Sequence, residues 1–301
     1  MADMIAREGF QLSLLPEAEQ ASQNEIDQEG DAAWLGVTEE EDAEQTINAL
    51  SSEPCDLLIV DHYSLDSRWE RNLRPHVNKI MAIDDLANRT HDCNLLLDQN
   101  YFREPEKRYK GLLPEHCDTL LGPKYALLRP EFREARNFCR MRGGGIARVL
   151  IYFGGNDPDN LTGMALEAMS DKSLSHLLVD AVVGPNNQYH AELKKQVEKR
   201  PGTQLHFQPE SFTELMLRAN LSIGAGGTTT WERLCLGLPS IVITVAENQE
   251  PFTAELDRDG LVSWIGRKGR VSASDISNGV INEINKFKAQ EITSNSPSPV
   301  D

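Results

Sequence analysis

The feature that most constrains this chain is its alternation of short, continuous apolar runs with amphipathic stretches. Eight runs predict strands, at residues 57–60, 79–83, 95–97, 148–153, 177–183, 205–207, 221–223 and 240–245. Within most of these runs apolar residues follow one another without polar alternation, which is typical of parallel strands buried on both faces. The sequence therefore predicts an α/β fold, with parallel sheets covered by helices.

The length of 301 residues favours about two domains. A short, basic, Gly-rich segment at residues 138–146 separates the first three runs from the other five and predicts the interdomain linker. Residues 290–301 are rich in Ser and Pro and predict a disordered tail. We therefore predict an N-terminal domain over residues 1–140 and a C-terminal domain over residues 141–289.

The chain is acidic, with 47 Asp and Glu against 30 Lys and Arg and a formal net charge of −17. That balance argues against general nucleic-acid binding and against a polybasic membrane contact. The sequence holds no apolar run long enough to span a membrane and predicts no signal peptide. Its five scattered cysteines predict neither disulfides nor a metal site. We expect a cytoplasmic monomer without metal or cofactor.

The strongest candidate for a binding site follows the predicted strand at residues 221–223. Three glycines and three threonines lead into a predicted helix, and glycine backbone with free N–H groups at a helix start suits phosphate. The spacing matches neither a Walker A loop nor G-x-G-x-x-G. Glu232, about one turn into that helix, could accept hydrogen bonds from ribose hydroxyls. The alternative is a tight strand-to-helix turn with a surface glutamate. The residues that we assign to the ligand are Gly226, Gly227, Thr228 and Glu232.

Two further strand ends carry candidate ligand residues. The strand at 148–153 leads into Gly154, Gly155 and Asn156, which form a ligand site or a plain turn. The strand at 240–245 leads into Asn248 and Gln249, whose amides suit uracil or sugar recognition, with a plain loop as the alternative. Together, these strand ends predict that the second domain binds a phosphate-bearing ligand, most simply a nucleotide sugar.

The first domain carries candidates for proton transfer. Asp61, His62 and Tyr63 directly follow the run at 57–60, and histidine is the natural proton-transfer group near neutral pH. The alternative is a structural His–Tyr pair. Asp84 and Asp85 end the next run, but adjacent residues of a strand point to opposite faces, so they do not form a catalytic pair by position alone.

Arg89 and His91 follow these two aspartates closely. We expect Arg89 to pair with one of the two carboxylates. A metal site that joins the aspartates to His91 is the interpretation that we do not favour.

Several multi-residue motifs, in one order, resemble the family of UDP-2,4-diacetamido-2,4,6-trideoxy-β-L-altropyranose hydrolases. In the first half they are VDHYSLD, IDDLANR, LDQN and GPKYALLRPEF, which begin at residues 60, 83, 97 and 122. In the second half they are YFGGND, GAGGTTTWE and AENQ, which begin at residues 152, 224 and 246. The resemblance runs from about residue 56 to residue 260. It implies two Rossmann-like domains of the GT-B type, similar to the MurG-type glycosyltransferases of peptidoglycan synthesis.

The resemblance also implies an activity. Water would attack the anomeric carbon of a UDP-linked diacetamido-trideoxy sugar and UDP would leave, in the pathway to pseudaminic acid, a nonulosonic acid used in flagellin glycosylation. By similarity Gly226, Gly227, Thr228 and Glu232 hold diphosphate and ribose, and Asn248 and Gln249 lie near the sugar or diphosphate. Tyr63 helps to position the sugar or the water. The activity needs no metal.

One departure from the family pattern stands at the start of the chain. Family members begin with a strand and a Gly-rich loop that ends in a histidine, which serves as the base for water. No Gly-x-Gly-His occurs here, so we expect the first strand of domain 1 and this loop to be absent. His62 as a substitute base is an alternative. Two other functions stay open, a GT-B glycosyltransferase with a UDP-sugar donor and a truncated, non-catalytic UDP-sugar-binding protein.

Overall fold

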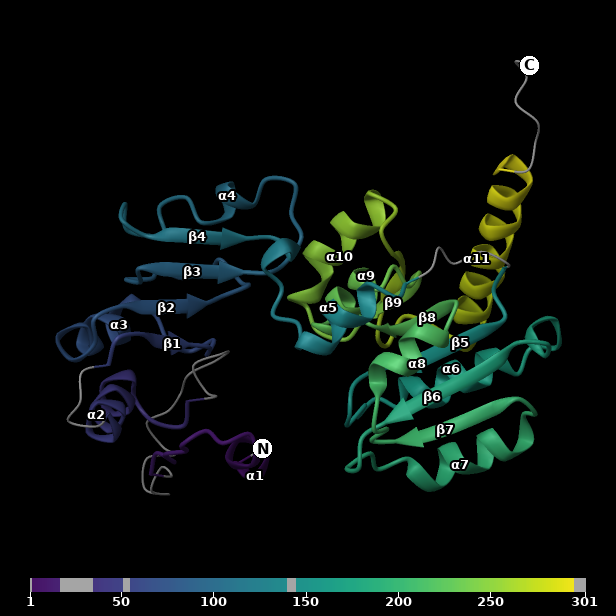
Figure 1. Ribbon diagram of the computed structural model, residues 1–301, viewed down its shortest axis with the longest axis horizontal. Coiled ribbons are helices and arrows are strands. Elements are labelled where there is room, and N and C mark those ends of the chain that lie inside the picture. Colours follow the sequence, from purple (N-terminus) through teal and green to yellow (C-terminus); the bar gives the residue numbers. More distant parts are fainter. Residues whose placement is uncertain (1, 17–34, 51–54, 140–144, 295–301) are drawn as a thin grey trace, which may run out of the picture. The chain divides into compact units, whose positions relative to one another are not determined.

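The computed structural model describes residues 2–16, 35–50, 55–139 and 145–294. It divides into two compact units, Met1–Ala126 and Leu127–Asp301, each built on its own parallel sheet (Figure 1). This confirms the predicted α/β architecture with parallel strands. Each unit has its own hydrophobic core, so each is described by itself.

Unit 1 holds a four-stranded sheet in the order β1-β2-β3-β4. Its strands are β1 (Leu58–Val60), β2 (Ile80–Ile83), β3 (Leu95–Asp98) and β4 (Asp118–Leu121). Its helices are α1 (Ala2–Arg7), α2 (Glu39–Ala49), α3 (Ser67–Leu73) and α4 (Pro105–Arg108), with 3₁₀ turns η3 (Arg74–His76) and η4 (Pro123–Tyr125). Trp69 joins two of these helices, because its indole N–H donates to Asp42 Oδ1 at 2.7 Å.

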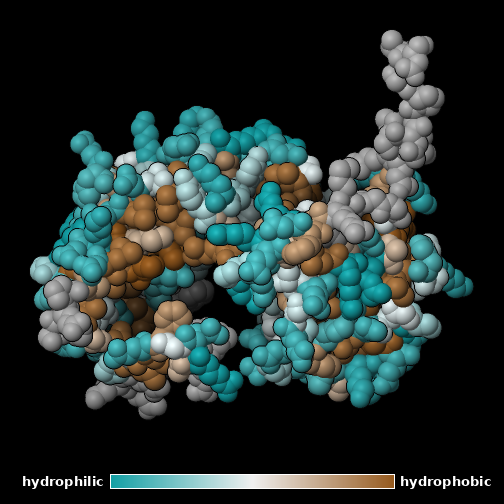
Figure 2. Space-filling model, viewed as in Figure 1, coloured by the Kyte–Doolittle hydropathy of each residue, from teal (hydrophilic) through white to brown (hydrophobic). Residues whose placement is uncertain are grey.

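Strand β1 is an edge strand of this sheet. The side chains of Ile59 and of the preceding Leu57 are exposed, and Figure 2 shows a band of hydrophobic residues on the visible face of unit 1. An edge strand offers unpaired backbone groups to other strands. The β1 edge therefore exposes apolar side chains beside its unpaired backbone groups.

Unit 2 holds a six-stranded sheet in the order β10-β9-β8-β5-β6-β7. Its strands are β5 (Arg148–Tyr152), β6 (Leu178–Val183), β7 (Thr203–Phe207), β8 (Leu221–Ala225), β9 (Ser240–Thr244) and β10 (Ser263–Arg267). The chain runs outward from β5 to β7, returns to place β8 beside β5, and then runs outward the other way. Ligands of such sheets bind beyond the carboxyl ends of the strands where the order reverses, which here are β5 and β8.

Helices cover both faces of this second sheet (Figure 1). They are α5 (Pro130–Arg136), α6 (Leu161–Met169), α7 (His190–Lys199), α8 (Phe212–Arg218), α9 (Thr229–Cys235), α10 (Gln249–Arg258) and α11 (Ala273–Ser294), with the 3₁₀ turn η5 (Lys172–Leu174). Within β5, Val149 and Ile151 belong to one buried cluster and Leu150 to the other. Burial on both faces explains why this run shows no polar alternation.

The division between the units lies before the predicted boundary at residue 140. Helix α5 belongs to unit 2 because its fully buried Phe132 packs in a cluster with Leu150 and Met216. Residues 140–144 of the predicted linker lie outside the described residues. Helix α11 continues to Ser294 and so overlaps the predicted tail, whose residues 295–301 also lie outside the description.

Two strands, β4 and β10, were not among the eight predicted runs. Both lie at the edge of a sheet, and both are broken by polar residues or glycine: β4 reads DTLL and β10 reads SWIGR. Among the helices of the described ranges, none is long and apolar enough to cross a membrane.

Candidate functional site

The predicted site residues lie at the carboxyl edges of the two sheets. In unit 1, residues 61–63 directly follow β1. In unit 2, residues 154–156 follow β5, residues 226–228 follow β8 and residues 248–249 stand at the start of α10, after β9. Since all strands of this sheet are parallel, their carboxyl ends share one edge. Unit 2 therefore brings three of the four predicted segments together.

The turn from β8 into α9 depends on close backbone packing. A Cβ atom at the buried Gly226 would lie 3.0 Å from Thr253 Oγ1 and 3.3 Å from Val242 Cγ1, so a side chain does not fit without movement. Thr228 precedes α9 with helical φ and ψ, and its side chain makes no capping hydrogen bond. Thr228 is exposed, so its side chain stands at the surface of the turn.

Gln249 joins the β9–α10 segment to this turn. The Val245 N–H donates to Gln249 Oε1 at 2.9 Å, and Gln249 Nε2 lies 3.7 Å from the position of a Cβ atom at Gly227. Asn248 occupies the N-cap position of α10. The structure thus brings Gln249 beside the glycine turn, with its amide N–H group on the side of Gly227.

Glu232 lies mostly buried in the first turn of α9, with a side-chain exposure of 16%. Burial raises the pKa of this carboxyl, and Arg129, whose Nη2 lies 3.9 Å from Glu232 Oε1, offsets part of the effect. Tyr152 at the end of β5 is close enough for Glu232 to add to the rise that burial causes in the pKa of its phenol. A carboxylate in this setting suits hydrogen-bond donors of a ligand better than a solvated surface position.

Arg233 is a functional candidate that the sequence reasoning missed. Its side chain is fully buried, and its Nη2 donates to the Ala225 carbonyl at 2.7 Å and to Thr230 Oγ1 at 2.9 Å. Its Nε and Nη1 atoms have no hydrogen-bond partner in the described part of the chain, and burial lowers its pKa to about 10. A side chain at Gly224 would collide with Nη1. A cation therefore lies directly against the β8 end of the glycine turn.

The turn after β5 is also built on glycine. Gly154 has φ +98°, in the left-handed region, and the Gly184 N–H donates to the Gly155 carbonyl at 2.8 Å. Asp157 accepts from the Leu161 and Thr162 N–H groups at 3.0 and 2.8 Å. This carboxylate satisfies the start of α6 from within the chain, so the turn does not leave that helix start open to an external anion.

In unit 1, the buried Asp84 lies at the centre of a polar network. Arg89 Nη1 lies 2.8 Å from Asp84 Oδ1, which confirms the expected Arg–Asp pair. The Tyr109 hydroxyl donates to Asp84 Oδ2 at 3.1 Å. His91 Nδ1 lies 2.7 Å from Glu70 Oε1, so that histidine is held by a buried carboxylate. No group of His, Cys, Asp and Glu side chains among the described residues is arranged to hold a metal ion.

Tyr63 and Asp85 meet at the same edge. Their side chains are hydrogen-bonded, and burial raises the pKa of both groups. Asn100 Nδ2 lies 3.4 Å from Asp85 Oδ2. Burial also raises the pKa of Asp98 to about 6, although Arg108 pairs with it and Tyr109 donates to it. Several buried carboxylates therefore stand within one network.

The other two residues of the predicted catalytic group lie differently. His62 Nδ1 accepts from the Ser64 N–H at 3.1 Å, and its carbonyl accepts from Arg89 Nη2 at 3.3 Å. Asp61 is exposed. Of the three predicted residues, Tyr63 alone is tied by its side chain to the aspartates after β2.

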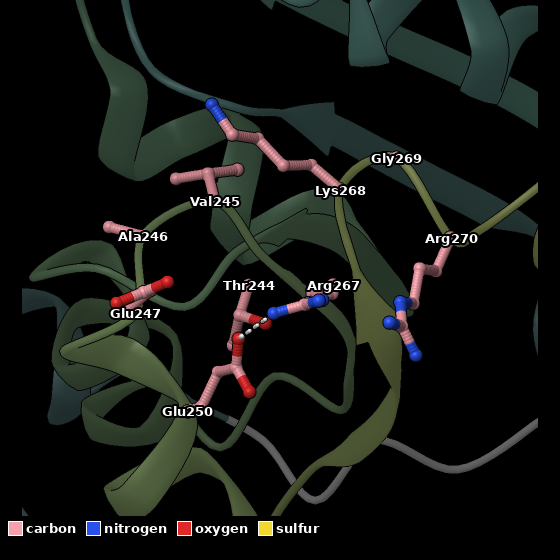
Figure 3. A pocket seen from close by; sticks show the side chains of 9 residues that line it. All are labelled: Thr244, Val245, Ala246, Glu247, Glu250, Arg267, Lys268, Gly269 and Arg270. Atoms are coloured by element: carbon pink, nitrogen blue, oxygen red, sulfur yellow. Dashed lines mark ion pairs between the residues drawn. The ribbon is translucent and has the colours of Figure 1, made fainter.

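A cavity of about 310 Å³ opens at the carboxyl ends of β9 and β10 (Figure 3). Arg267 Nη1 lies 3.7 Å from Glu250 Oε1, and Lys268 Nζ lies 2.8 Å from Asp159 Oδ2. In Figure 3 the charged end of Lys268 points away from Glu250. None of these cations was predicted as a site residue from the sequence. The lining residues are Thr244, Val245, Ala246, Glu247, Glu250, Arg267, Lys268, Gly269 and Arg270.

Comparison with known proteins supports the resemblance seen in the motifs, although no protein-family model matches the chain. The chain is 26% identical over 226 residues to the UDP-2,4-diacetamido-2,4,6-trideoxy-β-L-altropyranose hydrolase of Campylobacter jejuni, across 75% of this chain and 76% of that protein. It is 30% identical over 201 residues to the uncharacterized protein MJ1062 of Methanocaldococcus jannaschii, across 64% of this chain and 41% of that protein. It is 28% identical over 134 residues to the spore coat polysaccharide biosynthesis protein SpsG of Bacillus subtilis, across 42% and 38%. The chain thus spans less than half the length of two of these relatives.

Solved structures share the fold at low identity. MurG of Acinetobacter baumannii is 7% identical with a TM-score of 0.57, across 95% of this chain and 81% of that one. UGT89C1 of Arabidopsis thaliana is 12% identical with a TM-score of 0.55, across 93% and 78%. This chain therefore has the GT-B fold, with two Rossmann-like units, and it resembles the UDP-diacetamido-trideoxy-altropyranose hydrolase in sequence.

Proposed function

We propose that this protein is a hydrolase that removes UDP from a UDP-2,4-diacetamido-2,4,6-trideoxy-hexose on the route to a nonulosonic acid. The observation that carries the proposal is the glycine turn after β8, which lies at the reversal point of the unit 2 sheet with Glu232 and Gln249 beside it. The sequence similarity to the Campylobacter jejuni hydrolase supports the choice of reaction and substrate.

The nucleotide is assigned to unit 2. Gly226, Gly227 and Thr228 hold the diphosphate with backbone N–H groups and a hydroxyl, and Glu232 accepts from the ribose hydroxyls. The buried Arg233 adds positive charge beneath the turn, which offsets the acidity of a chain of net charge −17 for a dianionic ligand. Gly154, Gly155, Asn156, Asn248 and Gln249 complete this set of proposed ligand residues.

The glycosyl chemistry is assigned to the carboxyl edge of unit 1. Water attacks the anomeric carbon, the bond to the β-phosphate oxygen breaks, and UDP leaves. Tyr63 positions the water or the sugar, since its hydroxyl is held by Asp85. Asp61 and His62 stay candidates for the same step because they precede Tyr63 at the end of β1.

The test is UDP release from the UDP-diacetamido-altropyranose substrate, with UDP binding measured in parallel by calorimetry. We expect stoichiometric release without an acceptor, and a Glu232→Ala variant that binds UDP about 10- to 100-fold more weakly, the effect of losing charge-assisted hydrogen bonds. Release that requires an added acceptor would favour a glycosyltransferase instead. UDP binding without release would leave a non-catalytic UDP-sugar-binding protein, and unchanged UDP affinity in Glu232→Ala would refute the placement of the nucleotide.

A further inference from the structure

Asp85 stands where it can receive a proton through Tyr63. Strands β1 and β2 are parallel, and Val60 lies opposite Ala82. Tyr63 and Asp85 each come three residues after this aligned pair, so they follow the two strand ends at the same level. The phenol hydroxyl is hydrogen-bonded to the Asp85 carboxylate. Asp85 Oδ1 is buried and has no hydrogen-bond partner within the described ranges. We propose that Tyr63 and Asp85 form a proton relay in which Asp85 finally accepts the proton of the attacking water; the relay rests on the proposed hydrolase function.

The surrounding charges single out Asp85 from its neighbours. Asp84 is paired with Arg89 at 2.8 Å, and Asp98 is paired with Arg108. Arg108 reaches Asp85 by its backbone instead, since Nη2 donates to the Asp85 carbonyl at 2.7 Å.

The carboxylate of Asp85 is therefore the one of the three without an ion pair in the described network. The charged and titratable groups that influence this relay are Tyr63, Asp61, Asp84, Asp98 and Arg108. Burial raises the pKa of Asp85, and Arg108 only partly opposes this effect. A carboxylate with a raised proton affinity is a better base than a solvated one.

The step balances without a further reactant. The water oxygen forms the bond to the anomeric carbon as the bond to the β-phosphate oxygen breaks, and UDP leaves with that electron pair. The water proton passes to Tyr63 Oη while the phenol proton passes to Asp85. The phenol passes its proton to Asp85 as the water proton arrives, so that the relay needs no free phenolate. Asp85 then releases its proton to solvent and the phenol is restored.

The substitution Asp85→Asn separates a relay from simple positioning. Its amide oxygen can still accept from Tyr63 but cannot bind a proton, whereas Asp85→Glu keeps a carboxylate. We expect Asp85→Asn to lower kcat for UDP release at least 100-fold, to leave the Kd for UDP unchanged and to abolish the acid limb of the pH profile of kcat. Tyr63→Phe should cost as much, and the double variant should cost no more than either. Asp85→Glu should keep part of the activity.

The matched control is Asp118→Asn, an exposed aspartate at the amino end of β4. It should behave as the wild type. An Asp85→Asn variant with wild-type kcat or an unchanged acid limb overturns the relay while the hydrolase function stands. A wild-type chain that binds UDP but releases none overturns the hydrolase function and the relay with it.

Discussion

The carboxyl edges of the two sheets share one architecture and differ in their chemistry. The edge of unit 1 carries the aspartates 84, 85 and 98 with the phenols of Tyr63 and Tyr109 in one hydrogen-bonded network. The edge of unit 2 is built on glycine turns after β5 and β8, and its buried cation Arg233 faces backbone and hydroxyl groups. A dense set of buried acids suits proton transfer, whereas bare backbone suits close approach to a ligand.

Because of this difference, substitutions at the two edges should impair different properties of the protein. Changes at the unit 2 edge should act on backbone geometry and UDP affinity. Changes at the unit 1 edge should act on the stability and protonation of buried acids and leave UDP binding unaltered.

The largest effect should come from Gly184→Ala in unit 2. A Cβ atom there would lie 2.7 Å from the Gly155 carbonyl oxygen and 2.8 Å from Gly155 Cα, both of them backbone atoms. We expect a loss of about 3 kcal/mol in the free energy of unfolding, the upper part of the usual range for overpacking, and weaker UDP binding. Urea unfolding followed by the fluorescence of the unit 2 tryptophans, Trp231 and Trp264, with Trp34 and Trp69 replaced, measures the first effect and calorimetry the second.

Gly155→Ala is the matched control, because a Cβ atom there would lie 3.8 Å from its nearest neighbour, Gly184 Cα. Its stability should stay within about 1 kcal/mol of the wild type. Its UDP affinity should still fall, since the added methyl group keeps a ligand away from the backbone. Wild-type affinity in this variant would remove Gly155 from the ligand site.

Tyr109→Phe should be the most damaging conservative change in unit 1. It removes a buried hydroxyl that lies 3.1 Å from both Asp84 Oδ2 and Asp98 Oδ2, so the two buried carboxylates lose the single proton donor that they share. We expect a loss of about 2 kcal/mol, monitored by Trp69 fluorescence during urea unfolding, with an unchanged Kd for UDP. Tyr125→Phe serves as the control. A weakened UDP affinity in Tyr109→Phe would contradict the separation of roles.

Acidification from pH 7 to pH 5 should act on the two units differently. Burial raises the pKa of Asp98 to about 6, above the value of about 3.9 in an unfolded chain, so its folded form binds the proton more tightly. The contribution of Asp98 to stability is fully present below the pKa of the unfolded chain, and it is lost as the pH rises through the folded pKa of about 6. Unit 1 should therefore gain about 1 kcal/mol at pH 5 relative to pH 7.

Asp180 in unit 2 behaves in the opposite sense. Burial alone would raise its pKa, but hydrogen bonds from His206, Arg218 and Arg148 hold it below the usual value. Its contribution is therefore kept at pH 5 and lost only as the pH falls below the unfolded value. Urea unfolding at both pH values, in variants that keep Trp69 or Trp231 as the single tryptophan, measures the contrast. Asp98→Asn should remove most of the gain in stability that unit 1 shows at pH 5. A unit 1 that is less stable at pH 5 than at pH 7 would contradict this prediction.

The smallest effect should come from Lys268→Ala at the cavity of Figure 3. The ion pair with Asp159 spans 2.8 Å, but both side chains are more than 40% exposed. We expect a change of less than about 0.5 kcal/mol in stability. A double-mutant cycle with Asp159→Ala measures the coupling energy. A coupling above about 1 kcal/mol would contradict the small contribution expected of an exposed ion pair.

Much of the architecture could be read from the sequence. The strands predicted as continuous apolar runs occur in the structure, because burial on both faces of a parallel sheet demands such runs. The edge strands β4 and β10 were missed for the same reason, since edge positions tolerate polar residues and glycine. The glycine turns after β5 and β8 could also be located, because glycines that follow a predicted strand are visible in the sequence without knowledge of their contacts.

The tertiary structure alone decided which polar side chains meet. Asp85 is next to Asp84 in the sequence, but its side chain is hydrogen-bonded to Tyr63, which follows the end of the neighbouring strand β1. Nothing in the local sequence shows that Arg233 is buried while Glu232 next to it is partly open, since that depends on how α9 packs. The local sequence pattern predicts which segments are buried and where glycine gives the backbone conformational freedom. Pairing and pKa shifts depend on groups that lie far apart in the chain and become neighbours only when the sheets form.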